Sequence, residues 1–150
     1  MKSKRQEMIT KLVTTENIET QEELAEKLGS HGFVVTQATV SRDMKELHLV
    51  KVLTGNGTHK YATMEKAESD LQERFIRLFG NCVLSIIPCG NLIVIKTIAG
   101  SASVAAEAID NMQWAEVAGC IAGDNTVFLA VREGRNIAEL MRKLQKMAAR

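Results

Sequence analysis

The sequence predicts an α+β protein of two domains, a winged helix-turn-helix domain over residues 1–64 and an αββαββα domain over residues 71–150. Three segments with helical spacing of apolar residues precede an Asn-Gly turn signal, whereas the later hydrophobic runs are longer and rich in β-branched residues. A charged stretch without apolar periodicity, residues 65–70, separates the two patterns. We expect it to be a linker or the exposed start of a helix.

The first two helices are predicted by apolar spacing and by a capping motif. Residues 4–13 carry Met8, Ile9, Leu12 and Val13 at the spacing of one helix face. Thr20 and Glu23 then form a capping box, which opens a second helix that runs through Leu28.

A third helix is predicted to begin at Gln37, because Thr36 is a good N-cap residue. Val40, Met44 and Leu47 fall within roughly 60° of one another and suit burial. The outward positions are Ala38, Ser41, Arg42 and Lys45. A hydroxyl and two cations there suit contact with phosphate, and a guanidinium can also fork onto guanine. An ordinary amphipathic surface helix would show the same cations, so the neighbouring elements decide between the two interpretations.

A hairpin signal follows this helix. Residues 49–53 and 59–63 flank the segment TGNGT, in which Asn-Gly tolerates positive φ. Three helices followed by a hairpin predict a winged helix-turn-helix, whose hairpin lies beside the recognition helix. Lys51, His59 and Lys60 are then placed to meet backbone phosphates.

Bulk charge does not itself indicate a nucleic-acid partner. The chain has a formal net charge of +1, and residues 1–64 hold nine Lys or Arg against eight Asp or Glu. The cations nevertheless gather on the first predicted helix, on the third predicted helix and on the hairpin, the last two being the elements expected to contact DNA. We expect modest DNA affinity from one copy and stronger binding from several copies acting together.

The second domain is predicted from alternating helical and β-rich runs. Some of its apolar, Ala-rich surface is expected at subunit contacts. A short helix carries Leu71, Phe75, Leu78 and Phe79, and the remaining elements are two strands at 83–87 and 92–98, a helix at 104–112, two strands at 117–122 and 127–131, and a last helix at 137–147.

The sequence also predicts what kinds of protein this chain is not. No apolar run is long enough to span a bilayer and no signal-peptide pattern is present, so we expect a cytoplasmic protein. Cys82, Cys89 and Cys120 are expected to be buried free thiols, and the three histidines lack ligand spacing, so no metal or cofactor is predicted. The second domain has no histidine and no nucleotide-binding motif, and we expect no enzymatic activity.

Three segments together resemble the bacterial arginine repressor family: ETQEEL at 19–24, TQATVSRD at 36–43 and GCIAGDNT at 119–126. The resemblance covers nearly the whole chain. It implies an N-terminal domain that binds double-stranded operator DNA, with Ser41 and Arg42 as the principal groove contacts and Gln37 and Thr39 close by. Lys45 joins this set through its outward position.

The resemblance also implies a C-terminal domain that forms trimers, which pair into hexamers when L-arginine, the effector ligand, binds between them. The hexamer then represses arginine biosynthesis genes and, in some members, activates catabolic ones. Asp124 and Asn125 stand where the family usually carries two acids, and Ser103 stands where it has Gln or Asn. Asp110 matches a helix-terminal acid of the family.

Two alternatives remain open from the sequence. The segment GDNT at 123–126 is also an ordinary turn sequence. The departures at Asn125 and Ser103 also fit a paralogue that responds weakly or not at all to arginine, takes another ligand, or acts as an architectural DNA-binding protein or a partner in mixed hexamers.

Overall fold

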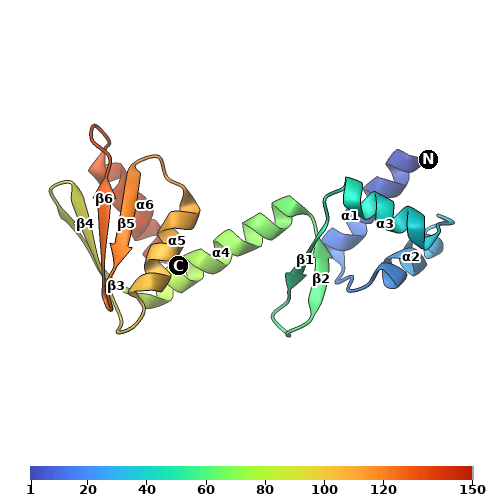
Figure 1. The fold of residues 1–150 in the computed structure, drawn as a ribbon, viewed down its shortest axis with the longest axis horizontal. Coiled ribbons are helices and arrows are strands. Elements are labelled where there is room, and N and C mark those ends of the chain that lie inside the picture. Colours follow the sequence, from blue (N-terminus) through green and yellow to red (C-terminus); the bar gives the residue numbers. More distant parts are fainter. Residues whose placement is uncertain (150) are drawn as a thin grey trace. The chain divides into compact units, whose positions relative to one another are not determined.

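The computed structural model describes residues 1–149 and divides the chain into two compact units, Met1–Asp70 and the residues from Leu71 on. Each unit has its own hydrophobic core. Figure 1 shows the elements of both units.

The N-terminal unit has the predicted order of three helices followed by a hairpin, which is confirmed. Its helices pack around a core that includes Ile9, Leu24 and Val40, each fully buried. The elements are α1 (Lys2–Thr15), α2 (Gln21–Ser30), α3 (Gln37–Glu46), β1 (Val50–Leu53) and β2 (His59–Ala62).

The predicted capping of α2 by Thr20 is confirmed, and the return bond to Glu23 is shifted by one residue. The Thr20 hydroxyl accepts a hydrogen bond from the backbone N–H of Glu23 at 3.1 Å. The Glu23 carboxylate in turn accepts from the backbone N–H of Glu19 at 3.0 Å, one residue before the N-cap whose N–H a capping box would engage. The entry of the chain into α2 is thereby fixed.

The wing is an antiparallel pair in which β1 and β2 are joined through the predicted Asn-Gly turn. Gly57 has a φ of 80°, which favours glycine, and Thr54 N–H donates to the Thr58 carbonyl at 2.7 Å. The backbone N–H of Tyr61 donates to the carbonyl of Ile18 at 2.8 Å. This bond ties β2 to the connection between α1 and α2.

Helix α4 (Met64–Cys82) begins earlier than the short helix expected from Leu71. Residues 65–70, expected as a linker or the start of a helix, are helical. The Thr63 hydroxyl accepts from the backbone N–H of Lys66 at 3.3 Å, and Lys66 pairs with Asp70 one turn later at 2.7 Å. Local capping and an i,i+4 ion pair thus favour a helix in a stretch that has no buried face.

The C-terminal unit has the predicted order αββαββα, which is confirmed. Its four strands form one antiparallel sheet in the order β3-β4-β6-β5, and Figure 1 shows α6 behind them. The elements that follow α4 are β3 (Val83–Cys89), β4 (Leu92–Thr97), α5 (Ala102–Met112), β5 (Val117–Ala122), β6 (Thr126–Val131) and α6 (Ile137–Ala148).

The two faces of this sheet differ in burial. One face is covered by the helices, because Ile93, Ile95, Val127 and Leu129 are fully buried in a core shared with residues of α4, α5 and α6. Side chains of adjacent strand residues alternate between faces. The opposite face therefore carries a cross-strand row, which we call the open-face row, in which each residue pairs with the next: Ile87, Val94, Phe128 and Ile121.

The cysteines correct one expectation. Cys82 is buried and Cys120 partly buried, but Cys89 is exposed, so the expectation of three buried thiols was wrong for Cys89. The predicted strand ends at residue 87, whereas β3 continues to Cys89, and the last three residues of this edge strand are exposed. All three cysteines are free.

Candidate nucleic-acid interface and ligand site

Helix α3 begins where the sequence predicts. Thr36 has extended backbone (φ −92°, ψ 159°), and its hydroxyl accepts from the backbone N–H of Thr39 at 3.3 Å. Its carbonyl accepts from the N–H of Val40 at 3.0 Å. Thr36 is therefore the N-cap, and the residues that follow have fixed positions around the helix.

The candidate DNA-contact residues occupy the less buried side of α3. Val40 and Met44 are buried against the core, whereas Gln37, Arg42 and Lys45 are exposed. Ser41 and Thr39 are half-buried, as is Leu47. The helix thus separates a core-facing stripe from a face that carries two cations.

The hydrogen-bonding state of these side chains differs. Gln37 Nε2 donates to Glu22 Oε1 of α2 at 3.0 Å, and the Thr39 hydroxyl lies 2.9 Å from that of Thr36. Within residues 1–149, no hydrogen bond or ion pair engages the side chain of Arg42 or Lys45. These two cations are the donors that can meet a nucleic acid without first losing a partner.

The wing adds further cations, but only some of them are available. Lys51 is exposed and its ammonium lies 5.3 Å from the centroid of the Tyr61 ring, which is a cation–π distance. Lys60 donates to Asn17 Oδ1 at 3.2 Å. His59 is exposed at the start of β2. Lys51 and Lys60 thus each have a partner, and among these three residues of the described chain only the side chain of His59 has none.

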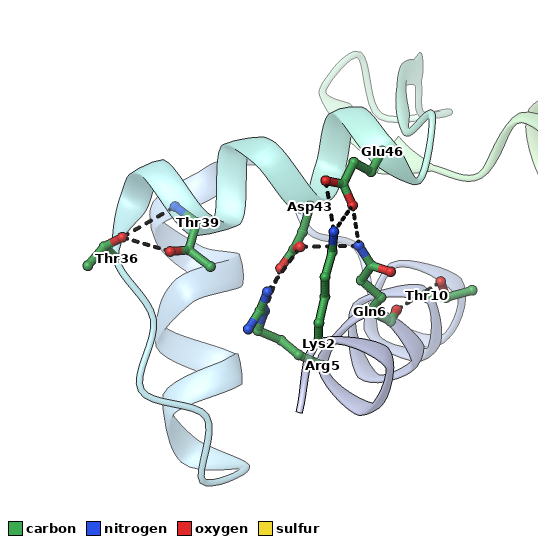
Figure 2. A network of polar contacts seen from close by, with 8 residues as sticks. All are labelled: Lys2, Arg5, Gln6, Thr10, Thr36, Thr39, Asp43 and Glu46. Atoms are coloured by element: carbon green, nitrogen blue, oxygen red, sulfur yellow. Dashed lines mark hydrogen bonds and ion pairs between the residues drawn. The ribbon is translucent and has the colours of Figure 1, made fainter.

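Helix α3 also contains a buried acid, Asp43, which its apolar spacing does not predict. Asp43 is 1% exposed and lies on the core side of the helix, where Arg5 Nε contacts its Oδ2 at 2.5 Å and Arg5 Nη2 contacts its Oδ1 at 3.1 Å (Figure 2). Gln6 Nε2 donates to the same Oδ1 at 3.2 Å. Its position could have indicated this burial, because Asp43 lies between Val40 and Met44, which were predicted to face the core. A carboxylate buried there needs a cation beside it.

Asp43 is expected to make the N-terminal unit sensitive to acid. The hydrogen bond from Arg5 lowers the pKa of the Asp43 carboxyl, the bond from Gln6 acts in the same direction, and burial opposes both. Because the folded-state pKa lies below the unfolded value of about 3.9, this stabilisation is present above about pH 4 and is lost as the pH falls through the folded-state pKa. Asp43→Asn cannot titrate, so below pH 4 its stability should fall less steeply.

Hydrogen exchange of the α1 and α3 amides between neutral pH and about pH 3 measures this effect. Glu7→Gln is the control, because Glu7 is exposed on α1. An Asp43→Asn chain whose protection falls as steeply as that of the wild type would contradict the assigned linkage.

Three of the four C-terminal candidate residues, Asp124, Asn125 and Ser103, lie at or beside the turn between β5 and β6. Asp124 and Asn125 are both exposed there. Asp124 Oδ2 accepts from the backbone N–H of Gly100 at 3.3 Å, and its carbonyl accepts from that of Ala102 at 3.2 Å. The turn is therefore held against the start of α5, which carries Ser103.

Asn125 is held by hydrogen bonds from Thr97 of β4 and from Thr126, the next residue in the chain. Its carbonyl accepts from the backbone N–H of Thr97 at 2.9 Å, and its side-chain oxygen accepts from the Thr126 hydroxyl at 3.0 Å. The side-chain amide keeps its N–H groups, which a ligand carboxylate could use, but it offers no negative charge.

Ser103 and Asp110 lie on one face of α5. They are seven residues apart, two helical turns, and both are exposed. The Cys120 thiol of β5 donates to Asp110 Oδ1 at 3.4 Å, and burial raises the pKa of Cys120 to about 12. Cys120 is thus neutral at neutral pH, and its contact with Asp110 was not anticipated. Asp124 approaches the start of α5 and Cys120 its second half.

This surface carries two carboxylates, those of Asp124 and Asp110, and one nearby cation, Lys96, whose Nζ donates to the Thr126 hydroxyl at 2.7 Å. In the described part of the chain, neither carboxylate is paired with a protein cation, whereas Ser103 offers only a hydroxyl.

Two further findings concern metal sites and membrane-spanning helices. Among residues 1–149, no group of three or more His, Cys, Asp or Glu side chains is arranged to hold a metal ion. Over the same residues, no helix is both long and apolar enough to cross a membrane.

Comparison with known families assigns both units. Residues 1–69 match the family model described as arginine repressor, DNA binding domain, and residues 79–146 match arginine repressor, C-terminal domain. The chain is 50% identical over 147 residues to an arginine repressor of Alkaliphilus oremlandii, covering 98% of this chain and 99% of the relative. The arginine repressors of Clostridium kluyveri, 50% identical over 98% of both chains, and Clostridium tetani, 46% identical over 98% of this chain and 96% of the relative, are similar throughout. The chain belongs to the arginine repressor family, with that family's DNA-binding domain followed by its C-terminal domain.

Proposed function

We propose that this chain is an arginine-responsive transcriptional regulator that binds operator DNA in the cytoplasm as a hexamer, with L-arginine as co-repressor, and controls genes of arginine biosynthesis and catabolism. The observation that carries the DNA-binding part is the exposed face of α3, where Arg42 and Lys45 have no protein partner among the described residues. Unpaired cations on a capped helix can fork onto guanine or phosphate without a prior rearrangement.

The ligand part of the proposal is supported by the chemistry of the candidate ligand site. L-arginine carries a guanidinium and an ammonium group, and both are attracted by carboxylates that lack a cationic partner. Asp124 and Asp110 are such carboxylates, and Asn125 and Ser103 add polar groups beside them. The candidate site is exposed on one chain, so closure by another subunit fits a ligand that promotes assembly.

Assembly is supported by the open-face row of the sheet. Ile87, Ile121 and Phe128 are 52%, 72% and 49% exposed. Apolar residues joined across all four strands form a contiguous patch, and such patches mark contact sites in soluble proteins. We assign this face to contact with further copies of the same chain.

Sedimentation and DNA binding test this function together. We would use a duplex that the wild-type protein selects from a random-sequence pool, the selected duplex, and a shuffled version of it, the shuffled duplex. We expect L-arginine to shift trimers to hexamers and to tighten binding to the selected duplex. Arginine without effect on either measurement would favour the alternative, an architectural protein whose assembly does not depend on arginine.

Asn125→Asp is expected to strengthen arginine binding. A charged acceptor contributes about 1.5–3 kcal/mol against about 0.5–1.5 kcal/mol for a neutral one, which corresponds to roughly tenfold in affinity. The aspartate also keeps the oxygen that accepts from the Thr126 hydroxyl. Asp124→Asn makes the opposite charge change at the neighbouring residue and should weaken binding by a similar factor. Calorimetry measures both, and equal affinities in all three chains would argue against the charge account.

A further inference from the structure

The two acidic side chains of α3 turn toward α1 instead of joining the exposed face (Figure 2). Glu46 contacts Lys2 Nζ at 2.8 Å and Gln6 Nε2 at 2.8 Å. Asp43 contacts Arg5 and Gln6, as described above. The first two turns of α1 therefore bind the second half of α3, the helix that carries Arg42.

The two ion pairs differ in burial. The side chains of Lys2 and Glu46 are 58% and 40% exposed, whereas those of Arg5 and Asp43 are 19% and 2% exposed. An exposed pair is screened by solvent and contributes little, whereas a buried carboxylate demands a close and well-oriented cation. Arg5 meets this demand with two nitrogens, so its pair with Asp43 is the one that restricts geometry.

This restriction acts directly on the DNA-contact residues. Asp43 follows Arg42 in the helix, and successive residues project about 100° apart. Fixing the rotation of the helix at Asp43 therefore fixes the direction in which the Cα–Cβ bond of Arg42 leaves it. Val40 and Met44 also hold α3 against the core, but hydrophobic burial is non-directional. A guanidinium fork on a carboxylate is planar and accepts one orientation.

We propose that Arg5 and Asp43 are positioning residues for sequence-specific DNA recognition: their buried bidentate pair fixes the rotation of α3 about its axis, and with it the direction of Arg42. The inference rests on the proposed function, because it takes α3 as the reading helix. The pair does not contact DNA in this proposal; it affects DNA binding through the orientation of Arg42 and Ser41.

A positioning role and a purely electrostatic role predict opposite results for Asp43→Asn. The variant removes a negative charge from the reading helix, so charge alone would strengthen binding to every duplex. A positioning role weakens binding to the selected duplex, while binding to the shuffled duplex stays equal or rises. The ratio of the two affinities separates the roles.

The experiment measures both affinities by fluorescence anisotropy, using the full chain with saturating L-arginine. Glu46→Gln is the matched control, because it removes the same charge from the same helix at the exposed pair. Arg5→Lys is the second test variant, since it keeps the positive charge but loses the fork. We expect Asp43→Asn and Arg5→Lys to lower the ratio at least tenfold and Glu46→Gln to change it less than twofold.

Each other outcome counts against the inference. If folded Asp43→Asn and Arg5→Lys chains keep the wild-type ratio, the positioning role is wrong while the proposed function stands. If circular dichroism shows that neither variant folds, the pair serves folding and not the aim of α3, and the inference is overturned. If the wild-type chain prefers no sequence, the proposed function fails and the inference fails with it.

Discussion

Arg42→Ala is expected to abolish the preference for the selected duplex while leaving the oligomer intact. Each bidentate contact to guanine supports about 1–3 kcal/mol of discrimination, roughly 5-fold to 150-fold for one subunit. The Arg42 side chain is exposed and has no partner within residues 1–149, so its removal creates neither a cavity nor an unpaired group. Anisotropy titrations against the selected and shuffled duplexes measure the loss, and sedimentation confirms the assembly.

Two variants control for charge in this experiment. Arg42→Lys keeps the positive charge but loses the fork, so we expect it to bind both duplexes with little preference. Lys11→Ala removes one charge from an exposed position on α1 and should weaken binding to both duplexes alike. An Arg42→Ala chain that still prefers the selected duplex would refute the role given to Arg42.

Phe128→Lys is expected to prevent assembly. Phe128 pairs with Val94 on one side and Ile121 on the other, so it lies in the middle of the open-face row. A lysine there would place a charge in the apolar contact between subunits. Assembly would then have to remove water from that charge at every such contact, which is costly. Sedimentation should show monomers, with or without L-arginine.

Loss of assembly should also weaken DNA binding by about 100-fold or more, because linked copies gain affinity through effective concentration. Leu53→Lys is the control for assembly alone, since it also introduces a lysine at an exposed apolar residue, 63% exposed on β1, and should leave the oligomer intact. Hexamers of Phe128→Lys in the presence of arginine would show that the open-face row is not the contact.

The predictable features of this chain are those with local causes. The start of α3 depends on Thr36 and its own next turn, and the wing depends on the Asn-Gly turn at Gly57. Helix spacing likewise identified the buried residues Val40 and Met44. Such features could be read from short windows because the interactions that create them are also short in sequence.

The features that were missed depend on residues far apart in sequence. The ion pair of Arg5 and Asp43 joins positions separated by 38 residues, and no pattern within α3 alone names its partner. Pairing of β4 with β6 gives the sheet order and thereby the open-face row, which no single strand reveals. Cys89 was misplaced because its exposure follows from the edge position of β3 in that order.

The candidate ligand site combines both kinds of information. The segment at 123–126 was recognisable as a turn, but its attachment to the start of α5 depends on bonds from Gly100 and Ala102. The contact between Cys120 and Asp110 likewise joins a strand to a helix. Resemblance supplied the candidate residues, and the fold supplies their neighbours.

Control of DNA reading by arginine can be measured by an anisotropy titration of the wild-type chain against the selected and shuffled duplexes, with and without L-arginine. We expect arginine to tighten binding to the selected duplex and to change binding to the shuffled duplex less. Equal binding to the two duplexes, or binding to the selected duplex that arginine leaves unchanged, would contradict the arginine-controlled reading of DNA by α3.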